Sequence, residues 1–411
     1  MQSALKKNPH DTNIDLVFLL YWGVLVLWQN VNPGSTGSLA DTLIKTGLIL
    51  FLVAYYLLHT STFSAKAFAF VVIFGLNMAI SYLNEDSVTL RNILTYFFPV
   101  VFAFLSCCTG ARFQINRKKL LRFMRILIFV VLYMTVYALL ATPEKFLRAL
   151  TTSTAYGNEL SSFLVSNLEY GMYLMAGIVA CIVCIELGEK KNIWKILFYG
   201  GSAVFFFCNL ILTYSRTSIL ATSLIIFSYG LLNRKRRIGK ILVLSILLLV
   251  GLIFCIPPLQ TFFGEIVFKG NNLAGRDELA SLASETFKNG SFSQKLWGRG
   301  DTAMSGFFRE EVNHASIHNA YLQILLYFGG IPLIIMLLFL CCRLRENVKS
   351  LVKSRVLGVL FIGLTLACAL TMVSSTVCLF SSPIDSFFVT MFTILVPKYV
   401  GNALSNGEFD S

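Results

Sequence analysis

Charged residues are scarce in this chain: they make up 13% of its 411 residues, while 56% of the residues are hydrophobic. Soluble domains average roughly 25% charged residues, so this composition excludes an ordinary soluble protein. Segments of alternating polarity, which would predict a membrane β-barrel, are also absent. The polar start leads into an apolar run without a small-residue cleavage site, so we expect no cleavable signal peptide.

Long apolar runs take the place of that missing charge. A helix needs about 20 mostly apolar residues to cross the hydrocarbon of a bilayer. Runs of this kind predict about twelve spans, near residues 14–31, 41–59, 63–83, 89–108, 122–141, 168–187, 194–213, 217–232, 240–258, 318–342, 356–376 and 380–397. The sequence therefore predicts an all-α polytopic membrane protein.

Lysine and arginine are distributed unevenly between the predicted loops. The basic clusters in 117–125, 234–240 and 343–355 all fall on the cytoplasmic side if the N-terminus is cytoplasmic. Cytoplasmic loops carry an excess of these residues, so we expect a multi-pass protein of the cell (cytoplasmic) membrane with both termini in the cytoplasm. This placement accounts for the net charge of +13, and no nucleic-acid partner is expected.

One predicted extracytoplasmic segment, from about residue 259 to 317, is much the longest polar stretch. Apolar residues recur in it at helical spacing, at Leu279, Leu282 and Phe287, which predicts a structured helical cap. The chain is therefore expected to divide into N-terminal membrane helices (1–258, about nine spans), the cap loop (259–317), and C-terminal membrane helices with a cytoplasmic tail (318–411, about three spans).

Three polar clusters interrupt the apolar pattern on the predicted outer face. Arg216 lies between two apolar spans, Arg276 follows a glycine in the cap, and His318 precedes the tenth span. Ionisable groups at a membrane are costly and are therefore functional candidates. A guanidinium offers a fixed fork of donors that suits phosphate, and a histidine accepts a proton near neutral pH. Taken alone, each has a plainer alternative: headgroup contact or helix capping for Arg216, surface ion pairing for Arg276, and headgroup contact for His318.

Together the clusters form an ordered pattern. Ser-Arg-Thr-Ser at 215–218 is followed by Gly-Arg at 275–276, Trp-Gly-Arg-Gly at 297–300, and His-Asn at 318–319 with a glycine pair at 329–330. This order resembles the O-antigen polymerase and ligase family (Wzy-like and WaaL-like proteins), most strongly over residues 205–335. The resemblance implies a GT-C-like membrane glycosyltransferase with an extracytoplasmic cavity and a large outer loop before the last three spans.

The resemblance also implies a substrate and residue roles. Members use sugar chains carried on undecaprenyl diphosphate. Arg216 and Arg276 match the family's essential arginines, and His318 matches its essential histidine. We hypothesise that the arginines hold the donor diphosphate and that the histidine accepts a proton from the attacking hydroxyl.

Further residues near these in the sequence are expected to contact the substrate. They are Asn319, Arg299, Tyr321, Ser215 and His314. Surface ion pairing remains the alternative for Arg299, and a place in the interfacial aromatic belt remains the alternative for Tyr321.

No metal and no cofactor are expected. The sequence contains no Asp-x-Asp pair of the kind that holds a divalent cation in many lipid-phosphosugar enzymes, so arginines would take the place of the cation. Most of the ten cysteines lie within apolar spans and are expected to be packing residues.

Three functions remain open from the sequence. The first is a polymerase that joins lipid-linked oligosaccharide repeat units into capsule, exopolysaccharide or O-antigen. The family resemblance implies a chain-length regulator and a flippase of the same pathway as its partners. The second is a ligase that moves a finished glycan from the same carrier to another acceptor. The third is a transporter or flippase, although transporters usually place their charged sites near the bilayer midplane.

Overall fold

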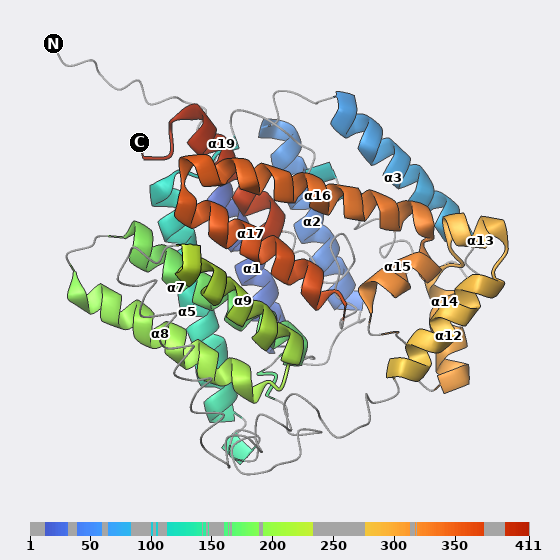
Figure 1. Ribbon diagram of the computed structural model, residues 1–411, viewed down its shortest axis with the longest axis horizontal. Helices are drawn as coiled ribbons and strands as arrows, with labels where there is room; N and C mark the ends of the chain where they lie inside the picture. The colour runs from blue at the N-terminus through green and yellow to red at the C-terminus, as the bar shows by residue number, and fades with distance from the viewer. Residues whose placement is uncertain are drawn as a thin grey trace.

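The computed structural model of the chain is all-helical (Figure 1). It describes residues 13–31, 39–59, 65–83, 100–101, 104–105, 113–141, 143–144, 147, 160–162, 164, 167–188, 192–232, 276–312, 317, 319–373 and 391–410. Among these residues there is no strand, and their regular structure is α-helical apart from one short π-helical segment. Helices pair their backbone groups internally, as a bilayer requires, so the expected all-α membrane class agrees with the structure.

Several apolar helices precede the cap in the described part of the chain. They are α1 (Ile14–Val31), α2 (Leu39–His59), α3 (Ala65–Leu83), α5 (Arg117–Ala141), α7 (Asn167–Leu187), α8 (Ile193–Leu212) and α9 (Arg216–Leu232). Among the helices that the structure describes, α5, α7 and α8 are long and apolar enough to cross a membrane, by length and composition. The helices coincide with apolar ranges predicted from the sequence, whereas the predicted span 240–258 and most of 89–108 lie outside the described residues.

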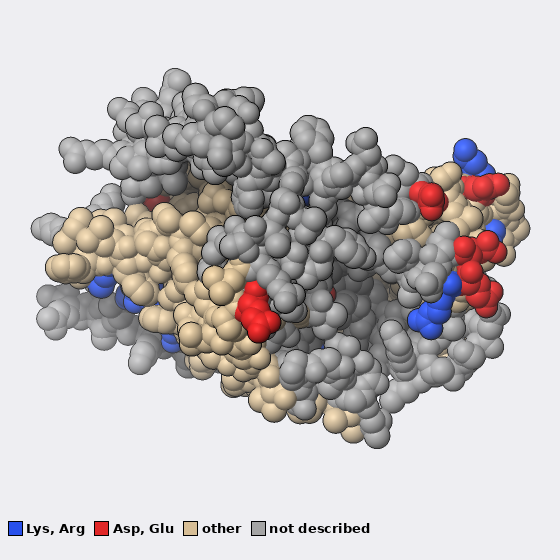
Figure 2. All heavy atoms as spheres, turned by 90° about the horizontal axis from the view of Figure 1, so that it is seen from below, with Lys and Arg blue, Asp and Glu red and all other residues tan. Residues whose placement is uncertain are grey.

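The described part of the cap at residues 276–312 is helical. It contains α12 (Arg276–Asn289), α13 (Phe292–Trp297) and α14 (Asp301–Val312). Figure 1 places these three helices together at one end of the long axis of the molecule. In the view of Figure 2, most of the described charged side chains lie over this end of the molecule. The described part of the cap is therefore a polar unit beside an apolar bundle.

The chain after the cap returns to the bundle. Its elements are α15 (Ala320–Tyr327), α16 (Gly330–Lys353), α17 (Arg355–Thr371), a π-helical segment (Met391–Leu395) and α19 (Val396–Asn406). The sequence predicts one span over 318–342, but the structure divides this range between α15 and α16, and α16 continues to Lys353. The predicted three-part division of the chain stays a prediction.

Helix α7 is the central helix of the described bundle. In the most apolar 18-residue stretch of α7, 83% of the stretch is buried, whereas the share for α8 is 28%. Helices α5, α8 and α9 all pack against α7. Helix α8 instead exposes large apolar side chains such as Trp194, Leu197 and Val204. Such side chains suit contact with lipid, so α8 lies at the edge of the bundle.

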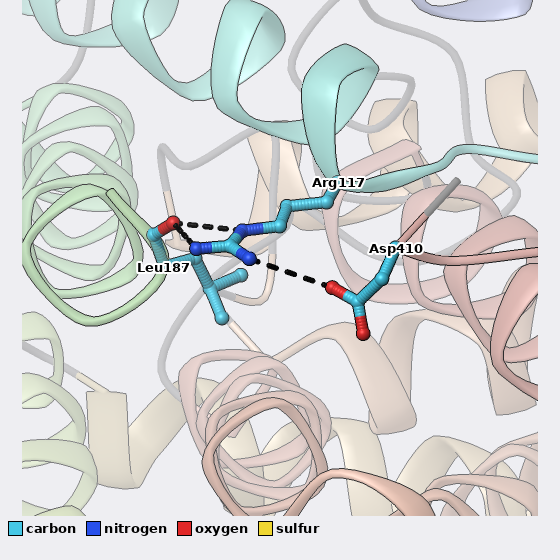
Figure 3. Close-up of polar contacts among 3 residues, drawn as sticks. All are labelled: Arg117, Leu187 and Asp410. Carbon is cyan, nitrogen blue, oxygen red and sulfur yellow. Dashed lines mark hydrogen bonds and ion pairs between the residues drawn. The ribbon is translucent and has the colours of Figure 1, made fainter. Parts of the chain in front are cut away.

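One end of the bundle is fixed by the first residue of α5. The Arg117 guanidinium donates two hydrogen bonds to the Leu187 carbonyl, at 2.9 and 2.6 Å, and lies 3.5 Å from the Asp410 carboxylate (Figure 3). The Arg117 backbone N–H also donates to the Phe409 carbonyl at 2.8 Å. The start of α5 therefore meets the end of α7 and the C-terminal segment. We name this end of the bundle the Arg117 end.

Helix α1 starts at the same end, because Asp15 pairs with Arg122 at 2.8 Å. The junction between α16 and α17 lies there too, since Lys353 donates to the carbonyls of Leu404 and Ser405 in α19 at 3.3 and 3.1 Å. The described parts of the chain nearest the two termini therefore lie at one end of the bundle.

The opposite end carries the turn between α8 and α9. Asn167, the first residue of α7, donates to the Thr213 carbonyl at 2.9 Å, which brings this turn to the start of α7. At the far end of α9, Tyr229 donates to the Glu186 carboxylate near the end of α7. Helices α7 and α9 therefore run parallel to each other and antiparallel to α5 and α8. We name this end, where Arg216 lies, the Arg216 end.

The break between α15 and α16 is held by the cap. Arg299 and Gly300 donate backbone hydrogen bonds to the carbonyls of Leu326 and Tyr327, at 2.9 and 3.1 Å. In addition, the Ser81 hydroxyl of α3 is 2.6 Å from the Trp297 carbonyl and 3.2 Å from the Phe328 carbonyl. The link between α13 and α14 thus pairs with the chain at the helix break, which leaves fewer backbone groups there without partners.

Candidate functional site at the Arg216 end

Arg216 is the first residue of α9, directly after a three-residue turn. Thr213, Tyr214 and Ser215 of this turn are buried, whereas the Arg216 and Thr217 side chains are half-buried. The turn is tight because the Thr213 hydroxyl donates to the Leu210 carbonyl at 2.7 Å and accepts from the Ser215 N–H at 3.1 Å. The local sequence therefore places a cation at the start of a helix, on a buried support.

The Ser215 hydroxyl contacts the first turn of α9, and its expected contact with the substrate stays a prediction. Its Oγ is 2.9 Å from the Ser218 Oγ, one turn along α9, and both side chains are buried. Its carbonyl accepts the Ile219 N–H at 2.9 Å, the first hydrogen bond of α9. In the structure, Ser215 thus helps to start the helix that carries Arg216.

Asn319 caps the start of α15. Its side-chain oxygen accepts the N–H groups of Tyr321 and Leu322, both at 3.1 Å. The Ala320 N–H donates to the Met372 carbonyl at 2.9 Å, just beyond the end of α17. His318 itself lies outside the described residues, but the two residues after it are held in place: Asn319 caps α15, and Ala320 is hydrogen-bonded just beyond the end of α17.

Tyr321 is also fixed to α17. Its hydroxyl donates to the Ala369 carbonyl at 2.8 Å, and its side chain is half-buried. This contact uses the one proton that the hydroxyl can donate, so the ring face and the oxygen lone pairs are what it still offers. The expected contact of Tyr321 with the substrate stays a prediction.

The cap residues of the prediction have different surroundings. Arg276 begins α12, and its side chain lies outside the described part, as does the whole of His314. The Arg299 guanidinium donates to the Thr286 carbonyl in the last turn of α12 at 3.1 Å. A cation at a helix C-terminus is favoured by the helix dipole, so this contact fastens α12 to the following link.

The structure brings part of the predicted site to one end of the bundle. Helix α17 begins at the Arg117 end and finishes beside Ala320, and α9 packs along it, with Gly363 of α17 facing Ile225 of α9. The first residues of α9 and of α15 therefore belong to the same end. Helix α12, which starts at Arg276, packs against α15. His318 and His314 are the site residues for which the structure gives no position.

Two structural features of this end are missing from the sequence prediction. Asn167, the first residue of α7, contacts the turn before Arg216, and Gly171, one turn further along α7, contacts α9. The sequence shows only a polar residue and a glycine at the start of an apolar span. Both are common there, so they do not indicate a contact with the Arg216 turn. The positive φ of Tyr214, 51°, has no local signal at all, because tyrosine does not favour that conformation.

Within the part of the chain that the structure describes, no three His, Cys, Asp or Glu side chains form a group that could hold a metal ion. Metal independence stays a prediction.

The fold and this site define a helical membrane protein with buried polar side chains around a turn at the Arg216 end of its bundle. Residues 201–338 match the family model described as O-antigen ligase (Wzy_C). This match, which runs from α8 into α16, confirms the resemblance to the O-antigen polymerase and ligase family and supports a membrane enzyme that processes glycans. No match was found among curated proteins or among solved structures.

Proposed function

We propose that this protein is a membrane glycosyltransferase that joins lipid-diphosphate-linked oligosaccharide repeat units into a surface polysaccharide, such as capsule, exopolysaccharide or O-antigen. The observation that carries the proposal is the family match, because residues 201–338 include Arg216, Arg276 and His318 together. The donor proposed from the family is a glycan on undecaprenyl diphosphate.

The proposed reaction uses two cations and one base. The acceptor hydroxyl oxygen attacks the anomeric carbon of the donor glycan, and the bond from that carbon to the diphosphate oxygen breaks. The diphosphate leaves with the electron pair, and Arg216 and Arg276 stabilise its negative charge. His318 takes the proton of the attacking hydroxyl. A diphosphate is a good leaving group, so the protein mainly positions it and neutralises its charge.

Charge placement supports an extracytoplasmic site. Basic residues gather at the Arg117 end, since Arg117 and Lys119 begin α5 and Lys353 and Arg355 flank the junction between α16 and α17. Because positive charge favours the cytoplasmic side, the Arg117 end is proposed to be cytoplasmic. The Arg216 end then faces outward, where surface polysaccharide is assembled.

A ligase is the second candidate. The printed description of the matching family model is O-antigen ligase, which favours transfer of a finished glycan to another acceptor. The donor half of the reaction is the same for both candidates, and the acceptor differs. A ladder of polymer lengths that disappears on deletion favours a polymerase, whereas polymer that persists on the lipid carrier favours a ligase.

The test is complementation of cells that lack this chain. Arg216→Ala and His318→Ala should abolish detectable polymer while the protein is still inserted, since loss of one charge-stabilising donor costs about 10²–10³-fold and loss of a base about 10²–10⁴-fold. Arg309→Ala is the matched control, because Arg309 is exposed on α14 of the cap. Full-length polymer from Arg216→Ala or His318→Ala at normal expression would refute the assignment.

A further inference from the structure

The turn that carries Arg216 adopts a backbone conformation that its own sequence does not favour. Tyr214 has a φ of 51°, in the left-handed region, although its side chain has a Cβ and is buried. Residues with a Cβ are disfavoured there and persist only where the surrounding structure holds them. Contacts from outside the turn should therefore act together with the Thr213 hydrogen bonds to keep Arg216 in place.

The outside contacts come from the chain around the start of α7. The last carbonyls of α8 have no partner within that helix. The Leu160 N–H donates to the Leu212 carbonyl at 3.2 Å, and the Asn167 side-chain amide donates to the Thr213 carbonyl at 2.9 Å. Thr213 is fully buried, so water is not available to replace the amide. Asn167 therefore holds the backbone three residues before Arg216.

A close helix contact lies one turn further along α7. A Cβ on Gly171 would come within 2.7 Å of the Ser218 Oγ and 2.9 Å of the Ser218 Cβ. Ser218 is fully buried and lies in the first turn of α9, where its Oγ meets that of Ser215. Gly171 therefore lets α7 and the first turn of α9 approach closely, and any larger side chain would displace the turn that begins with Arg216.

We propose that Asn167 and Gly171 are positioning residues, which hold Arg216 in place for the reaction without touching the substrate. This inference rests on the proposed function, because it gives Arg216 its role. The geometry carries it: Asn167 donates a hydrogen bond to the turn before Arg216, and Gly171 lies against the Ser218 side chain just after it. Between these two contacts Tyr214 has a backbone conformation that its own side chain disfavours. A misplacement of about 1 Å in a catalytic group can lower the rate about 10²-fold.

The first test removes the hydrogen-bond donor of the Asn167 side chain but keeps the shape of the side chain. Asn167→Asp cannot donate to the Thr213 carbonyl and places negative charge beside it, while Asn167→Gln can still donate. Asn402→Asp is the matched control, because Asn402 is also half-buried and donates to one backbone carbonyl, that of Phe113, at 3.3 Å near the Arg117 end. The purified proteins in liposomes are given lipid-linked glycan extracted from cells that lack this chain, and kcat, KM and the melting temperature are measured.

We expect Asn167→Asp to lower kcat about 10- to 10²-fold, with a smaller change in KM and a melting temperature close to that of Asn402→Asp. Asn167→Gln should recover part of the loss, and Asn402→Asp should keep the kcat of the unchanged protein. In an Arg216→Lys background, Asn167→Asp should cost much less than it does alone, because coupled residues are not additive. A kcat equal to that of Asn402→Asp, or full additivity with Arg216→Lys, would overturn the inference.

A second variant covers the case in which Asn167→Asp does not fold. Gly171→Ala should lower kcat in the same way, whereas Gly200→Ala in α8, where an added Cβ meets nothing within 4 Å, should not. Equal rates for these two alanine variants would also overturn the inference. Failure of the proposed function looks different: the unchanged protein would then show no transfer, or Arg216→Lys would keep the full rate whatever the substitution at Asn167 or Gly171.

Discussion

Gly298 of the cap link and Gly329 of the helix break lie against each other, backbone to backbone. A Cβ built on Gly329 would come within 2.6 Å of the Gly298 nitrogen, and both glycines have positive φ, 82° and 96°. The neighbouring Arg299 and Gly300 N–H groups donate to the carbonyls just before the break. The cap is thus joined to the bundle through two positions that accept glycine and no larger residue.

Substitution of either glycine should therefore loosen the cap. We expect Gly298→Ala and Gly329→Ala each to lower stability by about 1–3 kcal/mol or more, since each combines positive φ with a backbone clash. Thermal unfolding in detergent measures this. Gly306→Ala is the control, because Gly306 lies inside α14 with open space around its Cα. The stability of Gly306→Ala should be unchanged or higher by about 0.5–1 kcal/mol. The same loss of stability in all three variants would contradict the proposed junction.

The ion pair between Asp15 and Arg122 predicts an asymmetric response to mutation. The Asp15 side chain is fully buried and that of Arg122 is 48% exposed, with 2.8 Å between Nη2 and Oδ2. Arg122→Gln leaves a buried carboxylate without its cation, which lowers the stability of a protein by about 3–5 kcal/mol when the pair is fully buried. The loss should be smaller here because Arg122 is half exposed. Melting temperatures should fall for Arg122→Gln and recover in the double variant Asp15→Asn/Arg122→Gln.

The pair between Arg117 and Asp410 provides the comparison, since its side chains are 42% and 77% exposed. Asp410→Asn should cost no more than about 1 kcal/mol. If Arg122→Gln is no worse than Asp410→Asn, burial of Asp15 does not control the stability of this end.

Chelation tests the predicted absence of a metal requirement. If arginines neutralise the diphosphate, transfer by the purified protein should continue at its full rate in excess EDTA. Loss of activity in EDTA that magnesium or manganese restores would count against this prediction. An enzyme known to need a divalent cation, assayed in the same buffer, shows that the chelator is effective.

The helices of the bundle are largely predictable from the sequence, because their signals are local. The apolar runs at 168–187, 194–213 and 217–232 coincide with α7, α8 and α9 to within a residue or two. The sharp change from apolar to polar residues at 213–218 likewise locates the turn before Arg216. Length and polarity suffice for such features, since a bilayer leaves few alternatives to a helix.

The break between α15 and α16 is not predictable in this way. The sequence predicts one span because glycine and proline are tolerated within membrane helices. What stabilises the break comes from Trp297–Gly300 of the cap and from Ser81, about 30 and 250 residues away in the sequence. The contact of Asn167 with Thr213 is also tertiary, and nothing in the local sequence of either residue reports it.

The account is tested most directly by transfer in a purified system. The protein in liposomes is given lipid-linked glycan extracted from cells that lack this chain, and release of the polyprenyl diphosphate carrier is measured together with glycan length. We predict carrier release and longer glycans for the unchanged protein and for Arg309→Ala, and a loss of about 10²-fold or more for Arg216→Ala and His318→Ala. Carrier release at an equal rate by all four proteins, or by none of them, would contradict the account.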